Sequence, residues 1–440
     1  MKNSRNEGKI DRIKDLKSRI FFTIAVLVIY RFGTYLPLPG IDPLVFKQIS
    51  SQNQSGILGM LNMFSGGALG RMTIFSLNVM PYITASIIMQ LMTTTTPSLS
   101  ELKKSGEEGR KKISQYTRYF TIFLALFQSY GIAVGLENLS AQAGATVLYE
   151  GSFFRLTTVV SLVGSTMFLL WLGDQITARG IGNGISLIIF AGIVAELPSA
   201  LISTIELGKT GIYSTFFILF IIILIIGLIS VIVFFERSFR NIRVQYPKRN
   251  MGNIMSNSEG SHLPLKLNTS GVIPPIFASS LLLFPITIIS FGNTTNPSSI
   301  SSFVTANLAH GKPLFIIIYS LLIAFFCFFY TAIVFNAKET ADQLKKAGGF
   351  VAGIRPGEQT ANYLDDVLSK ITVIGAAYLV VICIIPELVI AKYSLPFYLG
   401  GTSLLIVVNV AMDSLTQVQS HLLSSKYDSV IKKNRIKIRA

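Results

Sequence analysis

The sequence predicts an all-α membrane protein, a helical bundle that crosses the bilayer many times, and composition and hydropathy indicate this fold class. Half of the 440 residues are hydrophobic and only 14% are charged, with a mean hydropathy of +0.56. A soluble protein of this length needs more surface charge. About ten apolar runs are long enough to cross hydrocarbon, which takes roughly 17 to 25 helical residues. Buried strands of a soluble α/β protein would be apolar over only about 4 to 8 residues.

The apolar runs predict ten spans: 20–36, 72–92, 116–136, 155–173, 184–203, 213–235, 270–290, 313–335, 371–390 and 396–416. The basic segment Met1 to Arg19 precedes the first run, but no A-x-A-like cleavage site follows, so we interpret the run as an uncleaved span. Of the 38 Lys and Arg residues, 31 lie on the side of the N-terminus and six on the other, with Arg31 inside the first span. Because basic loops stay in the cytoplasm, both termini are predicted to be cytoplasmic.

Ten spans divide into two five-helix halves, 1–208 and 209–440. Each half has an odd number of spans, so the two are inserted with opposite orientation, as in an inverted repeat. The long cytoplasmic loops of the second half, 236–267 and 336–370, are basic. Their Gly and Pro residues predict turns or hairpins.

A shorter apolar segment, about 15 residues at 56–70 with five glycines, lies between the first two spans. It is too short to cross the bilayer and is typical of a re-entrant or buried segment. Irregular backbone at membrane depth survives only where protein or a water-filled cavity surrounds it. We therefore expect a short helix that folds back into a central cavity; the alternative is an interfacial helix on the outer surface.

Few residues here suggest chemistry. The histidines are scattered, without an HExxH pattern, and the two cysteines lie in apolar runs without CxxC spacing. Neither a catalytic site, a metal site, a cofactor nor a disulfide is therefore expected. The charges within the spans lie near span ends, which argues against an ion-coupled transporter but leaves a transporter of neutral solutes open. These charged residues are Arg31, Asp174, Glu196 and Asp413.

Polar residues are concentrated in two otherwise apolar spans. The second span contains Asn78 and Gln90, and the seventh begins at Asn268 and continues to Pro274. Such residues either bond neighbouring helices or mark a helix interface that can open. Both interpretations stay possible at the level of the sequence.

Several longer motifs resemble the SecY/Sec61-alpha family, the pore subunits of protein-export channels, and the bacterial form fits best. The motifs follow the family's order from about residue 10 to residue 430, at 62–69, 80–88, 109–119, 179–186, 353–360 and 400–407. The resemblance implies a two-halved, clam-shell bundle with an hourglass pore in the bacterial plasma (inner) membrane. Unfolded polypeptides would cross through the pore, and membrane segments would leave sideways into lipid. The implied partners are the SecE and SecG subunits, the SecA motor ATPase, the ribosome and signal sequences.

The resemblance also implies roles for individual residues. A constriction ring would comprise Ile83, Ile87, Ile185, Ile189, Ile276 and Ile406. A plug at 57–69 would include Leu58, Leu61, Asn62, Met63, Phe64, Ser65, Gly66 and Gly67. A lateral gate would involve Asn78, Gln90, Asn268 and Pro274, and the partner-docking residues would be Arg243, Arg355 and Tyr427.

Two other functions, a transporter and a structural scaffold, are alternatives to this channel. A secondary transporter of a neutral solute, built from inverted repeats, would also have ten spans. A structural scaffold would leave the short segment at 57–69 without a role. Co-purification of a soluble ATPase or of ribosomes would favour the channel.

Overall fold

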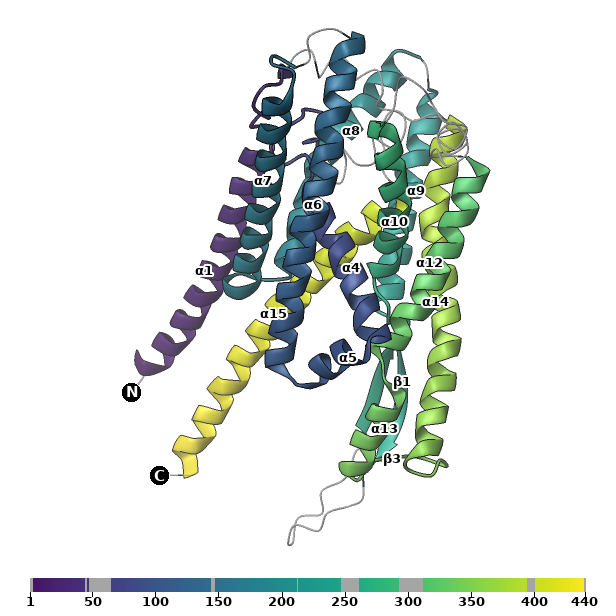
Figure 1. The fold of residues 1–440 in the computed structure, drawn as a ribbon. Helices are drawn as coiled ribbons and strands as arrows, with labels where there is room; N and C mark the ends of the chain where they lie inside the picture. Colours follow the sequence, from purple (N-terminus) through teal and green to yellow (C-terminus); the bar gives the residue numbers. More distant parts are fainter. Residues whose placement is uncertain are drawn as a thin grey trace.

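The computed structural model describes residues 3–43, 46, 65–143, 147–211, 213–246, 261–292, 312–393 and 400–438. They form a bundle of long helices with a small sheet at one end (Figure 1). The helices are α1 (Asn3–Gly33), α4 (Met80–Thr95), α5 (Pro97–Lys104), α6 (Glu107–Ala143), α7 (Ser152–Arg179), α8 (Gly184–Lys209), α9 (Thr215–Glu236), α10 (Ile273–Gly292), α12 (Pro313–Val334), α13 (Ala337–Lys346), α14 (Glu358–Tyr393) and α15 (Gly401–Ile438).

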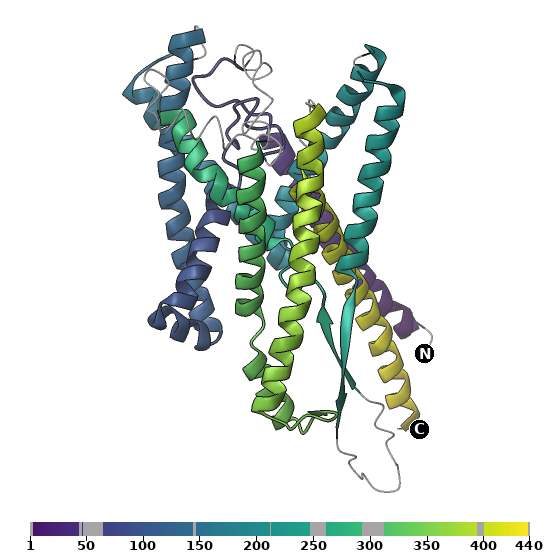
Figure 2. The same cartoon turned by 90° about the vertical axis from the view of Figure 1, so that its right-hand side faces the viewer.

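Each predicted span overlaps one of the long helices. Within the described ranges, seven helices are long and apolar enough to cross a membrane, and Ile273–Leu282 is a shorter apolar helix. The start of α1, the end of α15 and the small sheet lie at the same end of the bundle in both views (Figures 1 and 2). This arrangement is the one expected for an even number of crossings.

The second and seventh spans begin later than predicted, because prolines set their first turns. Residues 74–79 form turns, and α4 starts at Met80 with Pro81 in its first turn. The helix α10 likewise starts at Ile273, directly before Pro274 and Pro275. Proline suits a first turn because its missing N–H has no helical partner there and its φ is already helical. The backbone of Asn78, with φ of 48°, also interrupts any earlier helix.

A three-stranded antiparallel sheet joins the two long loops, which the sequence analysis treated separately. The strands β1 (Phe239–Gln245), β2 (Ser261–Lys266) and β3 (Phe350–Val351) lie in the order β2-β1-β3. The hairpin predicted for 236–267 is thus confirmed, with Arg243 opposite His262. The loop predicted at 336–370 is shorter than expected, because α13 fills its start and α14 already begins at Glu358.

The two halves of the chain meet along two seams. On one side α10 packs against α4 and α6, and on the other α15 packs against α8 and α1. One apolar core extends across both halves and includes Ile87, Ile189, Leu379 and Leu405. The seams therefore bring α4 against α10 and α8 against α15.

Candidate functional site

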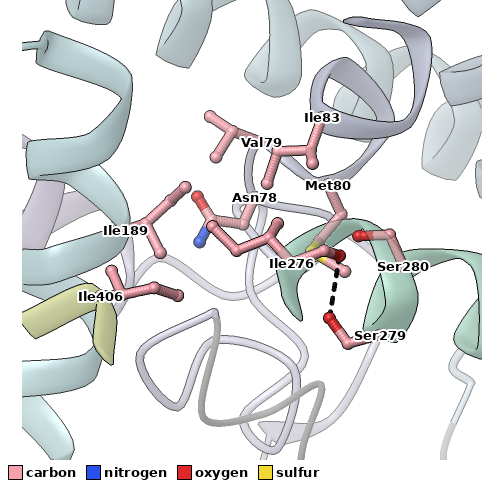
Figure 3. Close-up of a pocket in the computed structure, with 9 residues that line it drawn as sticks. All are labelled: Asn78, Val79, Met80, Ile83, Ile189, Ile276, Ser279, Ser280 and Ile406. Atoms are coloured by element: carbon pink, nitrogen blue, oxygen red, sulfur yellow. Dashed lines mark hydrogen bonds between the residues drawn. The ribbon is translucent and has the colours of Figure 1, made fainter. Parts of the chain in front are cut away.

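Four isoleucines from four helices surround one small cavity where the two halves meet (Figure 3). Ile83 and Ile189 come from α4 and α8 of the first half, and Ile276 and Ile406 from α10 and α15 of the second. The cavity, here called the constriction cavity, has a volume of about 10 Å³, close to the least that one water molecule needs. Its lining is largely apolar, so a hydrophobic surface surrounds this small space between the halves.

Helix starts determine where these isoleucines lie. Ile83 and Ile276 occupy the first turns of α4 and α10, which the prolines initiate. The side chain of Asn183 caps α8 by accepting hydrogen bonds from the backbone N–H groups of Ile185 (3.2 Å) and Ser186 (3.4 Å), as preferred N-cap residues do. These isoleucines therefore lie close to well-defined helix starts, which fix their positions.

The other two predicted ring residues lie outside the constriction cavity. Ile87 is buried in the shared core, one turn beyond Ile83 on the same face of α4. Ile185 is directed toward α7, since a Cβ added at Gly173 would come within 2.9 Å of its Cγ1. The structure therefore brings four of the six isoleucines together around the constriction cavity, and the other two are not part of its lining.

Polar atoms also reach the constriction cavity. Asn78, Ser279 and Ser280 line it together with Val79 and Met80. The Ser279 hydroxyl donates to the carbonyl oxygen of Ile276 at 2.9 Å, whereas the buried Ser280 hydroxyl has no hydrogen-bond partner within the described part of the chain. Neither serine was among the residues predicted from the sequence, although their spacing of three and four residues from Ile276 puts them on the same helix face.

Two of the four predicted gate residues lie near the contact between α4 and α10, and the other two form hydrogen bonds within their own half of the chain. Asn78 lies at the constriction cavity, and Pro274 is buried in the first turn of α10, which packs against α4. Gln90 bonds within its own helix, its Nε2 donating to Ser86 Oγ at 3.4 Å. Asn268 stays within the second half, its Nδ2 donating to Glu236 Oε1 at 2.6 Å. The α4–α10 contact thus exists, and the hydrogen bonds described here for Gln90 and Asn268 stay within one half of the chain.

Only the C-terminal end of the predicted plug is described. Leu58, Leu61, Asn62, Met63 and Phe64 lie outside the described residues. Residues 65–70 form turns rather than the expected helix, because Gly66 and Gly67 have φ of 64° and 80°, values that glycine adopts without strain. Ser65 is buried, and its Oγ accepts a hydrogen bond from the backbone N–H of Leu69 at 3.1 Å.

Two of the three predicted docking residues lie on or next to the small sheet. Arg243 is exposed on β1, and Arg355 is exposed in the turn between β3 and α14. The Thr360 hydroxyl donates to the carbonyl oxygen of Arg355 at 2.9 Å and fixes this turn. Tyr427 belongs to the C-terminal part of α15, and its side chain is outside the described part of the chain.

Comparison with known proteins agrees with this architecture. The SecY family model matches residues 73–415. "Protein translocase subunit SecY" of Rickettsia conorii is 54% identical over 423 residues, covering 96% of this chain and 97% of the relative. Two solved structures share the fold at 18% identity, each with 93% of both chains covered. They are "The structure of a protein conducting channel", with a TM-score of 0.62, and "Sec61 in the Canine ribosome-channel complex from the endoplasmic reticulum", with a TM-score of 0.60. The chain therefore belongs to the SecY family.

Proposed function

We propose that this chain is the central pore subunit of a protein-export channel in the bacterial plasma membrane, with both termini in the cytoplasm. It passes unfolded polypeptides across the bilayer and releases membrane segments sideways into lipid. The observation that carries the proposal is the constriction cavity, where isoleucines from four helices close a hydrophobic neck between the two halves. The high identity to a translocase subunit over nearly the whole chain supports the same function.

The apolar neck suits a pore that must pass chains of many sequences. Such a pore gains nothing from specific binding groups, and it must hold back ions while idle. A narrow apolar constriction does so by dewetting. Apolar side chains such as Ile83 and Ile406 also contact a passing chain without requiring a particular sequence. The channel itself carries out no chemistry, so a partner supplies the energy.

The same geometry supports a proposed gate and a proposed plug. The contact between α4 and α10 is one seam between the halves, and we assign it as the lateral gate with Asn78, Gln90, Asn268 and Pro274 on its flanking elements. The segment 57–69 is assigned as the plug of the pore. Its described end packs closely on α8, since a Cβ on Gly66 would lie 2.9 Å from the Cα of Gly192.

The small sheet is the proposed docking platform. It presents Arg243 and Arg355 at the end of the bundle that holds both chain termini, and Tyr427 belongs to the helix that ends there. The proposed partners are the SecA motor and the ribosome at this platform, with SecE and SecG as companion subunits. A structural relative described in a ribosome–channel complex supports the ribosome as a partner.

Reconstitution tests the proposed function. The purified chain with its co-purifying subunits is placed in liposomes, and a secretory precursor is added with a SecA-type motor and ATP. Protease protection of the precursor inside the vesicles, lost without ATP, is the expected result. Uptake of a small neutral solute without precursor translocation would instead indicate the transporter, a reading that the family membership does not support.

A further inference from the structure

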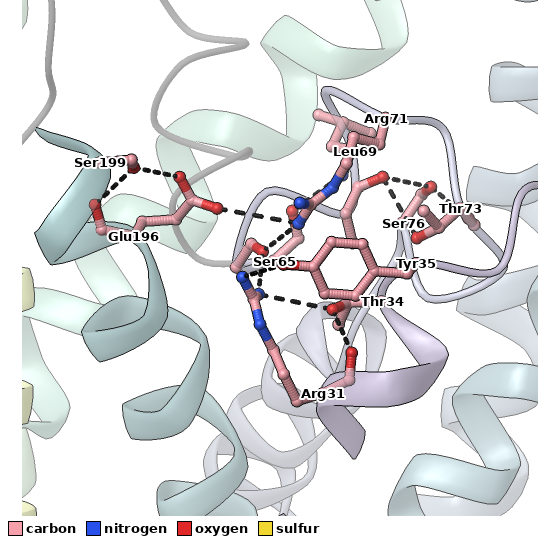
Figure 4. Close-up of polar contacts among 12 residues, drawn as sticks. Arg31, Thr34, Tyr35, Ser65, Leu69, Arg71, Thr73, Ser76, Glu196 and Ser199 are labelled. Atoms are coloured by element: carbon pink, nitrogen blue, oxygen red, sulfur yellow. Dashed lines mark hydrogen bonds and ion pairs between the residues drawn. The ribbon is translucent and has the colours of Figure 1, made fainter. Parts of the chain in front are cut away.

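Three charged side chains from different elements converge on the turn that ends the proposed plug (Figure 4). Arg31 of α1 donates from Nη1 to the carbonyl oxygen of Gly66 at 2.8 Å. Arg71, which follows the turn, donates from Nη2 to the same oxygen at 2.9 Å. Glu196 of α8 lies opposite, with its Oε1 at 3.8 Å from Arg71 Nη2. One backbone carbonyl is therefore held by two guanidinium groups, and one of these is paired with a helix of the pore wall.

Tyr35 keeps the two arginines in place. The guanidinium carbons of Arg31 and Arg71 lie 5.0 and 4.4 Å from the centre of its ring. Arg31 Nη2 also donates to the Tyr35 hydroxyl at 3.0 Å. Two like charges repel each other, and the ring face, the shared carbonyl and the Glu196 carboxylate compensate for this repulsion.

Close backbone contacts explain why the turn at residues 66 and 67 requires glycine. A Cβ on Gly66 would lie 2.9 Å from the Cα of Gly192, and a Cβ on Gly67 would lie 2.1 Å from Glu196 Oε1. Gly192 and Glu196 are one turn apart on α8, so they present one continuous face. The turn therefore lies directly on α8, with the charged groups around it.

We infer that Arg31, Arg71 and Glu196 form a clamp that holds the end of the plug on α8 and so sets how strong a signal sequence must be to open the channel. The inference rests on the proposed plug function. Charge-assisted hydrogen bonds to a carbonyl are among the stronger polar contacts, and these would break if residues 65–70 left α8. Because Arg71 and Glu196 are each more than a quarter exposed, their ion pair is the weaker part of the clamp.

The test uses two variants that each remove one charge and one matched control. Glu196→Gln removes the counter-charge, and Arg31→Gln removes one bond to the Gly66 carbonyl. Arg155→Gln is the control, because it breaks a shorter ion pair with Glu137, at 2.7 Å, that does not involve residues 65–71. The readouts are the export of a reporter with a crippled signal sequence, the ion conductance of idle channels, and the amount of chain in the membrane.

We expect the weak-signal export to rise up to about fivefold in Glu196→Gln and about tenfold in Arg31→Gln, with wild-type amounts of chain. Arg155→Gln should export the reporter at the wild-type level. If Arg31→Gln inserts poorly into the membrane, a second comparison, between a single and a double variant at Arg71 and Glu196, still tests the clamp. The double variant Arg71→Gln, Glu196→Gln should export only slightly more of the weak-signal reporter than Arg71→Gln alone, since the two residues act as a pair. Additive effects, or no rise in Glu196→Gln, would overturn the clamp.

Deleting residues 57–64 separates the clamp from the plug. If the deletion relaxes signal stringency and Glu196→Gln adds nothing to it, the clamp acts through the plug as inferred. If Glu196→Gln still raises export in the deleted channel, it acts elsewhere and the clamp is wrong, while the plug proposal stands. If the deletion itself changes neither stringency nor conductance, the plug proposal fails, and the inference fails with it.

Discussion

Serine at two walls of the constriction cavity should let water and ions through the idle channel. We choose Ile189→Ser together with Ile406→Ser, because one comes from each half of the chain and both line the cavity. The native cavity is close to the size of a single water molecule. The two substitutions remove apolar volume and add hydroxyls beside the Ser280 hydroxyl, which lacks a described partner. A bound water needs about two to four polar partners, which the altered cavity would offer.

The expected size of the effect follows from burial. Ile189 is 7% exposed and Ile406 is 3% exposed, and burying an isoleucine fully contributes about 1.5 to 3 kcal/mol. The pair thus contributes roughly 3 to 6 kcal/mol to the dry state of the neck. If the substitutions remove half of the lower value from the free energy that keeps the neck dry, the fraction of channels with a water-filled neck rises about tenfold. This follows because about 1.4 kcal/mol corresponds to a factor of ten.

Single-channel recording in planar bilayers measures this change directly. Idle channels of the double variant should conduct small ions at least about tenfold more often than wild type. Ile222→Ser with Ile223→Ser on α9 is the matched control, because both side chains are exposed on the bundle surface at 43% and 60%. If the cavity variant is as ion-tight as this control while present in normal amounts, the four isoleucines do not form the seal.

Three further predictions address the docking platform, the topology and the second half of the chain. Arg355→Glu should lower motor-driven export at least about tenfold by reversing an exposed charge at a partner contact, with unchanged chain levels by immunoblot; normal export would leave Arg355 a topology charge. Reporter enzymes fused after Gly208 should be active outside the cell and those fused after Gly349 inside it; a cytoplasmic reading at Gly208 would rule out the ten-span topology. Asn268→Ala should destabilise the chain by about 1 to 3 kcal/mol, because the buried Glu236 carboxylate loses a 2.6 Å donor; an unchanged thermal midpoint in detergent would show that the bond contributes nothing.

Local sequence patterns were enough for the helices and the family. Hydrophobic runs predicted the order and approximate positions of the long helices, because a helix at membrane depth forms its backbone hydrogen bonds within itself, whatever its neighbours are. The boundaries were less accurate. The prolines at 81 and 274 make α4 and α10 start later than predicted. These prolines are visible in the sequence, but a hydropathy average over a long window does not register them.

Side chains at the neck were only partly predictable. The family resemblance named six isoleucines, and the structure gathers four of them around one cavity. Periodicity places Ile83 and Ile87 on one face of α4 but does not say which of the two reaches the neck. That depends on where the helix starts and on how far α10 and α15 approach it.

The sequence by itself determined the helical class, the order of the spans, the predicted orientation from basic loops, and membership of the family. Only the tertiary structure decided which distant residues meet. Arg31 and Glu196 lie in different helices, yet both approach the turn at Gly66 and Gly67. One sheet likewise pairs Val244 with Val351, from strands that lie far apart in the sequence. Local periodicity reports which face of a helix is apolar. Contacts between elements arise from packing across the whole bundle, and no single stretch of sequence encodes them.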